Sequence, residues 1–157
     1  MYSYIYKSKL GNIYLESDGV YLTKLSFEKS NYLIKNLLIF QETSKWLDIY
    51  FSGKMPNFVP LIKLENLTLF QKQVLNILKG VSYGNTITYS KLAFEVAKLR
   101  KKEEMSAQAI GHALSKNPIA IIIPCHRVVG KNNKLVGYHW GLDIKKKLLE
   151  IEGNIYE

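Results

Sequence analysis

Apolar and polar residues alternate along the start of the chain with a period of two, which is typical of β-strands. The dipeptides Gly11-Asn12 and Asp18-Gly19 interrupt the alternation, and both favour the tight turns of β-hairpins. The apolar positions of this pattern are Ile13, Leu15, Val20, Leu22, Leu25 and Phe27. The pattern predicts an antiparallel β-meander.

The period becomes helical after Asn31. A first helical face is formed by Leu33, Ile34, Leu37 and Leu38. A polar break at residues 41–44 precedes a second helical piece, which carries Trp46, Leu47, Tyr50 and Phe51 and closes at Gly53. Residues 54–66 contain two prolines and are predicted to be a linker.

Three helix starts are predicted in the second half from capping residues. Thr68 and Gln71 have the spacing of a capping box at the start of one helix. We expect Thr88 to cap a helix over 89–97 and Ser106 to cap a helix over 107–114. The last two helices fit either a helix-turn-helix or a plain helical hairpin, and the pattern alone favours the hairpin. After them we expect a strand at 119–123, a hairpin around 130–133, and a final helix capped by Asp143 and ended by Gly153.

Charge and composition narrow the class of protein. The chain has 157 residues and a net charge of +9; residues 1–66 carry +2 and residues 67–157 carry +7. The basic second half fits a polyanion partner, although a lysine-rich solvated surface gives the same count. One cysteine excludes an internal disulfide and argues against a zinc site, and we expect no metal. No stretch has the length of a membrane helix or the pattern of a signal peptide, so we expect an intracellular, cytoplasmic protein (nuclear only in a eukaryote) without membrane attachment.

The segment 119–129, IAIIIPCHRVV, holds that cysteine, Cys125, where an apolar run meets a proline. A lone thiol is usually an inert small hydrophobe, and its thiolate must be stabilised before it reacts. His126 is the adjacent base, but neighbouring side chains on a strand point apart, so the two can meet only at a turn or through a water. The acids Asp143, Glu150 and Glu152 are candidates to orient the imidazole, and Glu152 lies at a helix end that disfavours negative charge.

The string Ile-Pro-Cys-His-Arg-Val at 123–128 resembles the active-site signature of the O6-alkylguanine-DNA alkyltransferases. The resemblance extends over nearly the whole chain, in matching order and spacing. It includes Tyr50-Phe51-Ser52-Gly53, residues 70–75, Tyr83-Gly84, Thr88-Tyr89, Asn117-Pro118, Gly141-Leu142, Lys145 and residues 148–153.

The resemblance implies repair of DNA by irreversible, single-turnover transfer of an alkyl group, mainly methyl, from O6 of guanine to Cys125, and by extension from O4 of thymine. No cofactor is implied. In the implied mechanism, His126 takes the thiol proton through a water, and Glu152 orients the imidazole ring of His126. Asn117 braces the active-site turn, and Tyr89 helps to protonate the flipped guanine at N3. The implied pocket comprises Leu114, Val128, Tyr138, His139, Trp140 and Lys145. The implied partner is double-stranded DNA, bound by a monomer through the minor groove, with contacts from Thr88, Tyr89, Ser106, Ala107, Gln108, Gly111, Arg100, Lys101 and Lys102.

Three features depart from the family pattern. Gln108 stands where the family usually inserts an arginine into the base stack, so we expect phosphate contacts from Arg100, Lys101 and Lys102 to compensate. His139 and Trp140 replace small residues and predict a pocket that disfavours benzyl-sized adducts. The zinc ligands of some members are missing.

The fold implied is α+β: an N-terminal domain with an antiparallel sheet and helices over 1–66, and a mostly helical domain over 67–157 with a winged helix-turn-helix and the cysteine. Two other functions remain open. A sensor would bind alkylated DNA without modification, and a Cys-His-Glu hydrolase would turn over, so mass gain and turnover discriminate the three.

Overall fold

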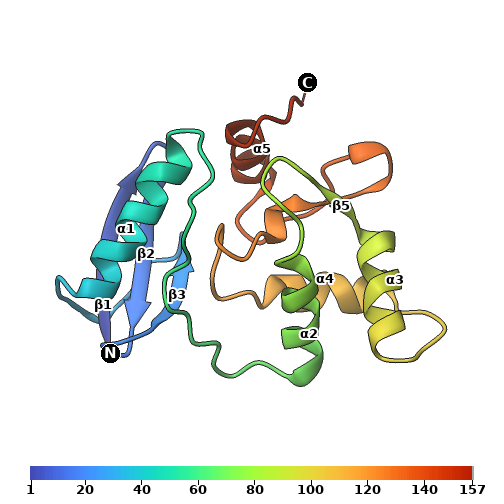
Figure 1. Cartoon of the computed structure of the whole chain (residues 1–157), viewed down its shortest axis with the longest axis horizontal. Coiled ribbons are helices and arrows are strands. Elements are labelled where there is room, and N and C mark those ends of the chain that lie inside the picture. The colour runs from blue at the N-terminus through green and yellow to red at the C-terminus, as the bar shows by residue number, and fades with distance from the viewer. Residues whose placement is uncertain (157) are drawn as a thin grey trace. The chain divides into compact units, whose positions relative to one another are not determined.

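The computed structural model describes residues 1–156 and divides the chain into two compact units (Figure 1). The first unit contains residues 1–65 together with residues 118–122, and the second contains residues 66–117 together with the chain from residue 123 onward. The sequence placed 118–122 in the C-terminal domain, whereas in the structure this segment pairs with Leu25 of the first unit. No helix within residues 1–156 is long and apolar enough to cross a lipid bilayer.

The first unit is a four-stranded sheet covered by one helix, and it confirms the predicted meander (Figure 1). Its elements are β1 (Tyr2–Ser8), β2 (Gly11–Ser17), β3 (Leu22–Ser26), β4 (Leu33–Ile34) and α1 (Leu38–Phe51), with the strand order β3-β2-β1-β4. On β1, Tyr4 lies opposite Leu15 and Tyr6 opposite Ile13. The same tyrosines stack on Phe40 and Phe51 of α1, with ring centroids 5.8 and 6.2 Å apart. The helix therefore packs on the apolar face that the alternation predicted.

The predicted helix after Asn31 is wrong. Leu33 and Ile34 form β4, a short parallel partner of β1, and both side chains are exposed. The predicted polar break at 41–44 is also wrong, because these residues continue α1, where the Thr43 hydroxyl is buried and donates to the Ile39 carbonyl at 2.8 Å. Val20 is 62% exposed and does not belong to the core.

The second unit is mostly helical and carries the predicted caps. Its elements are α2 (Leu69–Leu78), β5 (Ile87–Thr88), α3 (Tyr89–Leu99), α4 (Ala107–Ser115), the 3₁₀ helices η1 (Cys125–Arg127) and η2 (Lys131–Asn133), β6 (Val128–Val129) and α5 (Leu142–Ile151). Thr68 and Gln71 form the expected capping box, and the Thr88 and Ser106 hydroxyls accept from backbone amides in the first turns of α3 and α4. These caps satisfy amides that a helix cannot pair internally, which is why the helices begin there.

Two predictions near the C-terminus are wrong. The residues after Val129 do not form a hairpin; Asn132 and Asn133 adopt left-handed conformations, with φ of 59° and 60°, and β6 instead pairs in parallel with β5. The cap of α5 is Gly141, whose φ is 96°, and Asp143 lies inside the first turn.

The predicted strand at 119–123 is wrong as well. Only Ile119 makes a bridge, to Leu25, and the chain then folds into two tight turns. The Ile122 amide donates to the Ala120 carbonyl at 2.7 Å, and the Cys125 amide donates to the Ile123 carbonyl at 2.9 Å. Ile121 has a φ of 69°, which a β-branched residue rarely adopts. An apolar run predicts burial, which is correct here, but not its conformation.

Candidate active site

Cys125 begins η1 directly after the second tight turn, and its side chain is buried, with 6% of the residue exposed. The Asn117 side-chain amide donates both to the Ile123 carbonyl at 2.9 Å and to the Cys125 Sγ at 3.2 Å. This one amide therefore pins the turn and touches the sulfur. Burial raises the pKa of Cys125 above its ordinary value, more than the Asn117 hydrogen bond and the Lys145 charge lower it. The thiol rests protonated, so a reaction at the sulfur requires a proton acceptor.

His126 is that acceptor by position and charge state. Its ring is fully buried, and its Nε2 lies 2.5 Å from Oε2 of Glu152. Burial lowers the pKa of His126, more than its contact with Glu152 raises it, so the ring rests neutral. With Nε2 donating to the carboxylate, the tautomer leaves Nδ1 as the acceptor, and this buried atom has no hydrogen-bond partner among residues 1–156.

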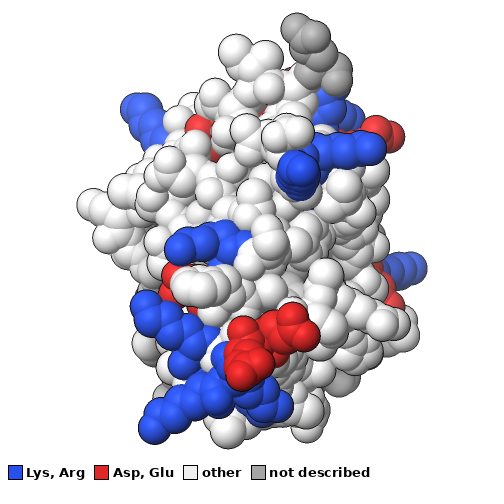
Figure 2. Space-filling model, turned by 90° about the vertical axis from the view of Figure 1, so that its right-hand side faces the viewer, with Lys and Arg blue, Asp and Glu red and all other residues white. Residues whose placement is uncertain are grey.

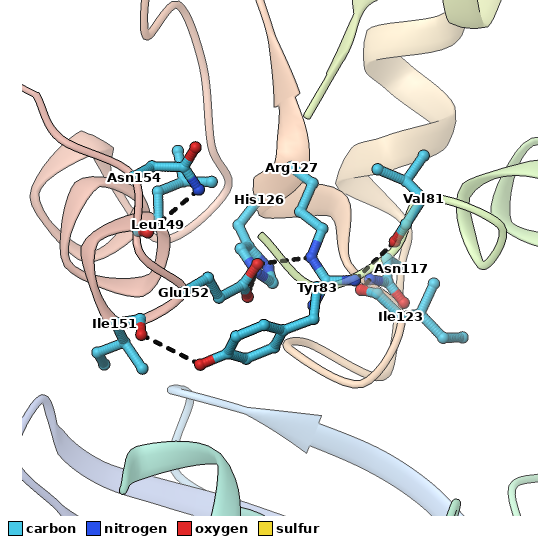
Figure 3. Close-up of polar contacts among 10 residues, drawn as sticks. All are labelled: Val81, Tyr83, Asn117, Ile123, His126, Arg127, Leu149, Ile151, Glu152 and Asn154. Atoms are coloured by element: carbon cyan, nitrogen blue, oxygen red, sulfur yellow. Dashed lines mark hydrogen bonds and ion pairs between the residues drawn. The ribbon is translucent and has the colours of Figure 1, made fainter. Parts of the chain in front are cut away.

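Glu152 lies beside His126 and Arg127 (Figure 3). It stays ionised although only 5% of the residue is exposed. Burial alone raises the pKa of its carboxyl group, but the hydrogen bonds from His126 and Arg127, together with the Arg127 charge, lower it to about 2. Arg127 Nε donates to Oε1 at 2.7 Å, and its Nη1 donates to the Val81 carbonyl at 2.7 Å. The expected pair of His126 and Glu152 is present, together with an arginine to which the sequence assigned no role.

Lys145 is also buried, but it does not line the pocket. Its Nζ donates to the carbonyls of Val128 and Gly137, the second at 2.7 Å, and lies 5.8 Å from the centre of the Tyr89 ring. Burial lowers the pKa of Lys145 to about 8. The lysine therefore joins α5 to β6 and to the loop before α5 that carries Gly137.

A cavity of about 560 Å³ opens above the cysteine. Of the predicted site residues, it is lined by Tyr89, Ala107, Gln108, Gly111, Leu114, Cys125, Tyr138 and His139. Val128, Trp140 and Lys145 are not in its lining, which corrects the expected pocket. Trp140 instead packs edge-on against Tyr138 and His139, with ring centroids 5.7 and 4.7 Å away. The sequence missed Ser115, Val136 and Gly137, which carry no chemical signal of their own.

The cavity is bordered by α4, whose exposed residues include Ala107 and Gln108. Thr88 and Ser106 cap α3 and α4, and Thr88 lines a neighbouring hollow of about 420 Å³ with Glu103, Glu104 and Lys131. The side of the molecule that lies to the right in Figure 1 carries basic and acidic side chains next to one another (Figure 2).

Arg100, an expected phosphate contact, is partly buried. Its Nη1 donates to Gln73 at 2.6 Å, and its guanidinium lies 5.2 Å above the Phe70 ring, so it packs on α2. Lys101 and Lys102 are exposed, and phosphate contacts by all three residues stay predictions.

Comparison with known proteins identifies the family. Residues 1–65 match the model "6-O-methylguanine DNA methyltransferase, ribonuclease-like domain", and residues 69–154 match "6-O-methylguanine DNA methyltransferase, DNA binding domain". The methylated-DNA–protein-cysteine methyltransferase of Methanosarcina acetivorans is 40% identical over 98% of this chain and 99% of its own, and that of Haemophilus influenzae is 34% identical over 97% and 86%.

A solved structure agrees in fold. The Mycobacterium tuberculosis protein OGT, crystallised in complex with DNA, superposes with a TM-score of 0.84 at 32% identity, covering 97% of this chain and 92% of that one. This chain thus combines an α+β architecture with a buried Cys125 beside a pair of His126 and Glu152. The relatives named above match it over nearly its whole length. This chain belongs to the methylated-DNA–protein-cysteine methyltransferase family.

Proposed function

We propose that this protein repairs DNA by transferring an alkyl group, mainly methyl, from O6 of guanine to Sγ of Cys125. The observation that carries the proposal is a protonated, buried thiol at a cavity of about 560 Å³, beside a neutral histidine backed by an ionised glutamate. A cavity of this size accommodates a nucleobase.

The proton leaves the thiol first. His126 Nδ1 accepts it through a water bridge, which the neighbouring positions of Cys125 and His126 on η1 favour over direct contact. The resulting imidazolium is stabilised by Glu152, and the Asn117 amide stabilises the thiolate. The thiolate then attacks the alkyl carbon.

One bond forms and one breaks in the transfer. The S–C bond forms, the C–O6 bond breaks, and its electron pair stays with the guanine, which takes a proton at N3 from the Tyr89 hydroxyl. Burial raises the pKa of Tyr89, so this hydroxyl is protonated at neutral pH and can donate. The proton held by the His126 imidazolium then passes through solvent to the Tyr89 oxygen, which restores the phenol. The products are guanine and a thioether, which water cannot displace, so each molecule reacts once.

Binding of double-stranded DNA supplies the substrate, and we place the α4 surface in the minor groove. Ala107 and Gly111 are small enough for close approach of the helix to the groove floor. The target base must leave the stack to reach the sulfur of Cys125, a residue that is only 6% exposed. Gln108, at the cavity rim, fills the space that the base leaves. We propose that a monomer suffices and that O4-alkylthymine also reacts.

The test is intact-protein mass spectrometry after incubation with a duplex containing O6-methylguanine. We expect one added methylene mass on the wild type and none on Cys125→Ala, with the modified peptide containing residue 125. Binding without mass gain would indicate a sensor, and product in excess of protein would indicate a hydrolase; either result contradicts the proposal.

A further inference from the structure

Arg127 is a buried cation in direct contact with the proposed proton-transfer pair, and the reaction described above gives it no role. Only 8% of the residue is exposed. Burying an arginine is costly unless its charge and donors are matched, so such a residue usually has a specific partner. Here the partners are Oε1 of Glu152 and the Val81 carbonyl, each at 2.7 Å.

The loop at residues 81–84 holds the guanidinium and the end of α5 together (Figure 3). The Tyr83 ring lies under Arg127, 5.9 Å from the guanidinium carbon to the ring centre, and its hydroxyl donates to the Ile151 carbonyl at 3.1 Å. Gly84 has a φ of 85°, and a side chain there would start 3.4 Å from the Glu152 carbonyl oxygen. The Tyr83-Gly84 pair thus fixes the backbone on which Glu152 is carried.

We propose that Arg127 is a positioning residue for alkyl transfer: it holds one oxygen of Glu152 so that the other faces His126, and its positive charge adds to burial in disfavouring a second positive charge on His126. This inference rests on the proposed function. Arg127, Glu152, His126 and Cys125 together carry no net charge before the proton moves and none afterwards, because imidazolium and thiolate appear together.

Without Arg127, the buried carboxylate would have no cation beside it, and the pair of His126 and Glu152 would take up a proton at higher pH. A histidine that already carries a proton cannot accept one from the thiol. Four other ionisable groups act on this cluster. Lys145 from α5 carries a charge that also lowers the pKa of His126. The other three are the hydroxyls of Tyr83, Tyr89 and Tyr138, whose pKa values burial raises, so none of them is ionised near neutral pH or replaces the lost charge.

The experiment uses full-length protein with Arg127→Met and measures two quantities against pH. One is the single-turnover rate with an O6-methylguanine duplex at saturating protein, and the other is the titration of His126 by NMR, assigned among the three histidines by a His126→Gln variant. We expect the midpoint of both curves to rise by about 1 pH unit or more, since a charge within contact distance shifts a pKa by roughly that amount. A folded Arg127→Met protein with wild-type midpoints would overturn the proposal.

Two further variants keep the inference testable if Arg127→Met does not fold. Arg127→Lys keeps the charge but cannot reach both Glu152 and Val81, so we expect a wild-type midpoint with a maximal rate about tenfold lower; an unchanged maximal rate counts against the positioning role. Arg100→Met removes the other arginine of the chain, which also packs on an aromatic ring, and should leave the midpoint unchanged. The NMR titration does not depend on transfer, so a shifted His126 in a protein that gains no methyl group would refute the proposed function and not the effect of Arg127.

Discussion

Replacement of Asn117 by alanine removes the amide that joins the active-site turn to the sulfur. Two hydrogen bonds are lost, to the Ile123 carbonyl and to Sγ of Cys125, at 2.9 and 3.2 Å. The Ile123 carbonyl keeps the bond from the Cys125 amide, so we expect the free energy of unfolding to fall by only about 1–2 kcal/mol. The thiolate loses a donor, and a hydrogen bond to a charged group contributes about 1.5–3 kcal/mol. That corresponds to a transfer rate about 10- to 100-fold lower at neutral pH.

The assay is the single-turnover rate at saturating protein, followed by intact mass, with urea unfolding of the same samples. Asn154→Ala is the matched control, because the Asn154 amide also donates to a backbone carbonyl, that of Leu149 at 3.3 Å, but not to the sulfur. The control should lose some stability and keep its rate. If folded Asn117→Ala protein reacts as fast as the wild type, the amide does not support the thiolate and our account of the sulfur is wrong.

The remaining predictions concern acid stability, DNA binding and substrate size. The pKa of Glu152 is about 2 in the folded protein against 4.5 ordinarily, so the ionised carboxylate adds about 3 kcal/mol to the free energy of unfolding above pH 4.5, and this contribution is lost as the pH falls toward 2. In Glu152→Gln, the free energy of unfolding measured with urea should therefore depend less on pH between 4.5 and 2 than in the wild type. Lys101→Glu with Lys102→Glu should reduce the slope of log affinity against log salt by about 2, and an unchanged slope excludes both from the phosphate contacts. Gln108→Arg should tighten binding of a lesion duplex by about fivefold in a titration, since it adds one cation at the cavity rim. The wild-type protein should react faster with methyl adducts than with benzyl adducts, and equal rates would contradict this prediction. Trp140→Gly should reduce the difference between the two rates, because Trp140 packs against Tyr138 and His139 at the pocket.

The features that the sequence determined are local ones. The capping box of Thr68 and Gln71 and the caps at Thr88 and Ser106 were predictable because the bonded atoms belong to residues three apart. The N-terminal meander followed from a period of two and its turn dipeptides. The same local reasoning failed at Leu33 and Ile34, where pairing with β1 decides the conformation instead of helical spacing.

The candidate site was predictable only in part. The residue types around Cys125 and their resemblance to a family singled out His126 and Glu152, and the structure brings these two within 2.5 Å. The role of Arg127 was not visible, because its partner carbonyl at Val81 lies 46 residues away in sequence. The run at 119–123 signalled burial, yet its start is held by backbone bonds between Leu25 and the residues Pro118 and Ala120, and its second turn by the Asn117 side chain.

The sequence by itself therefore determined which residues carry the chemistry and where most helices begin, because nucleophilicity and capping depend on residue type and short spacing. Only the tertiary structure decided which of these residues meet and in which charge state. Burial raises the pKa of the Cys125 thiol, lowers that of the His126 ring, and leaves Glu152 ionised beside Arg127. These shifts arise from desolvation and from charges brought together by folding, and no pattern along the chain encodes either quantity.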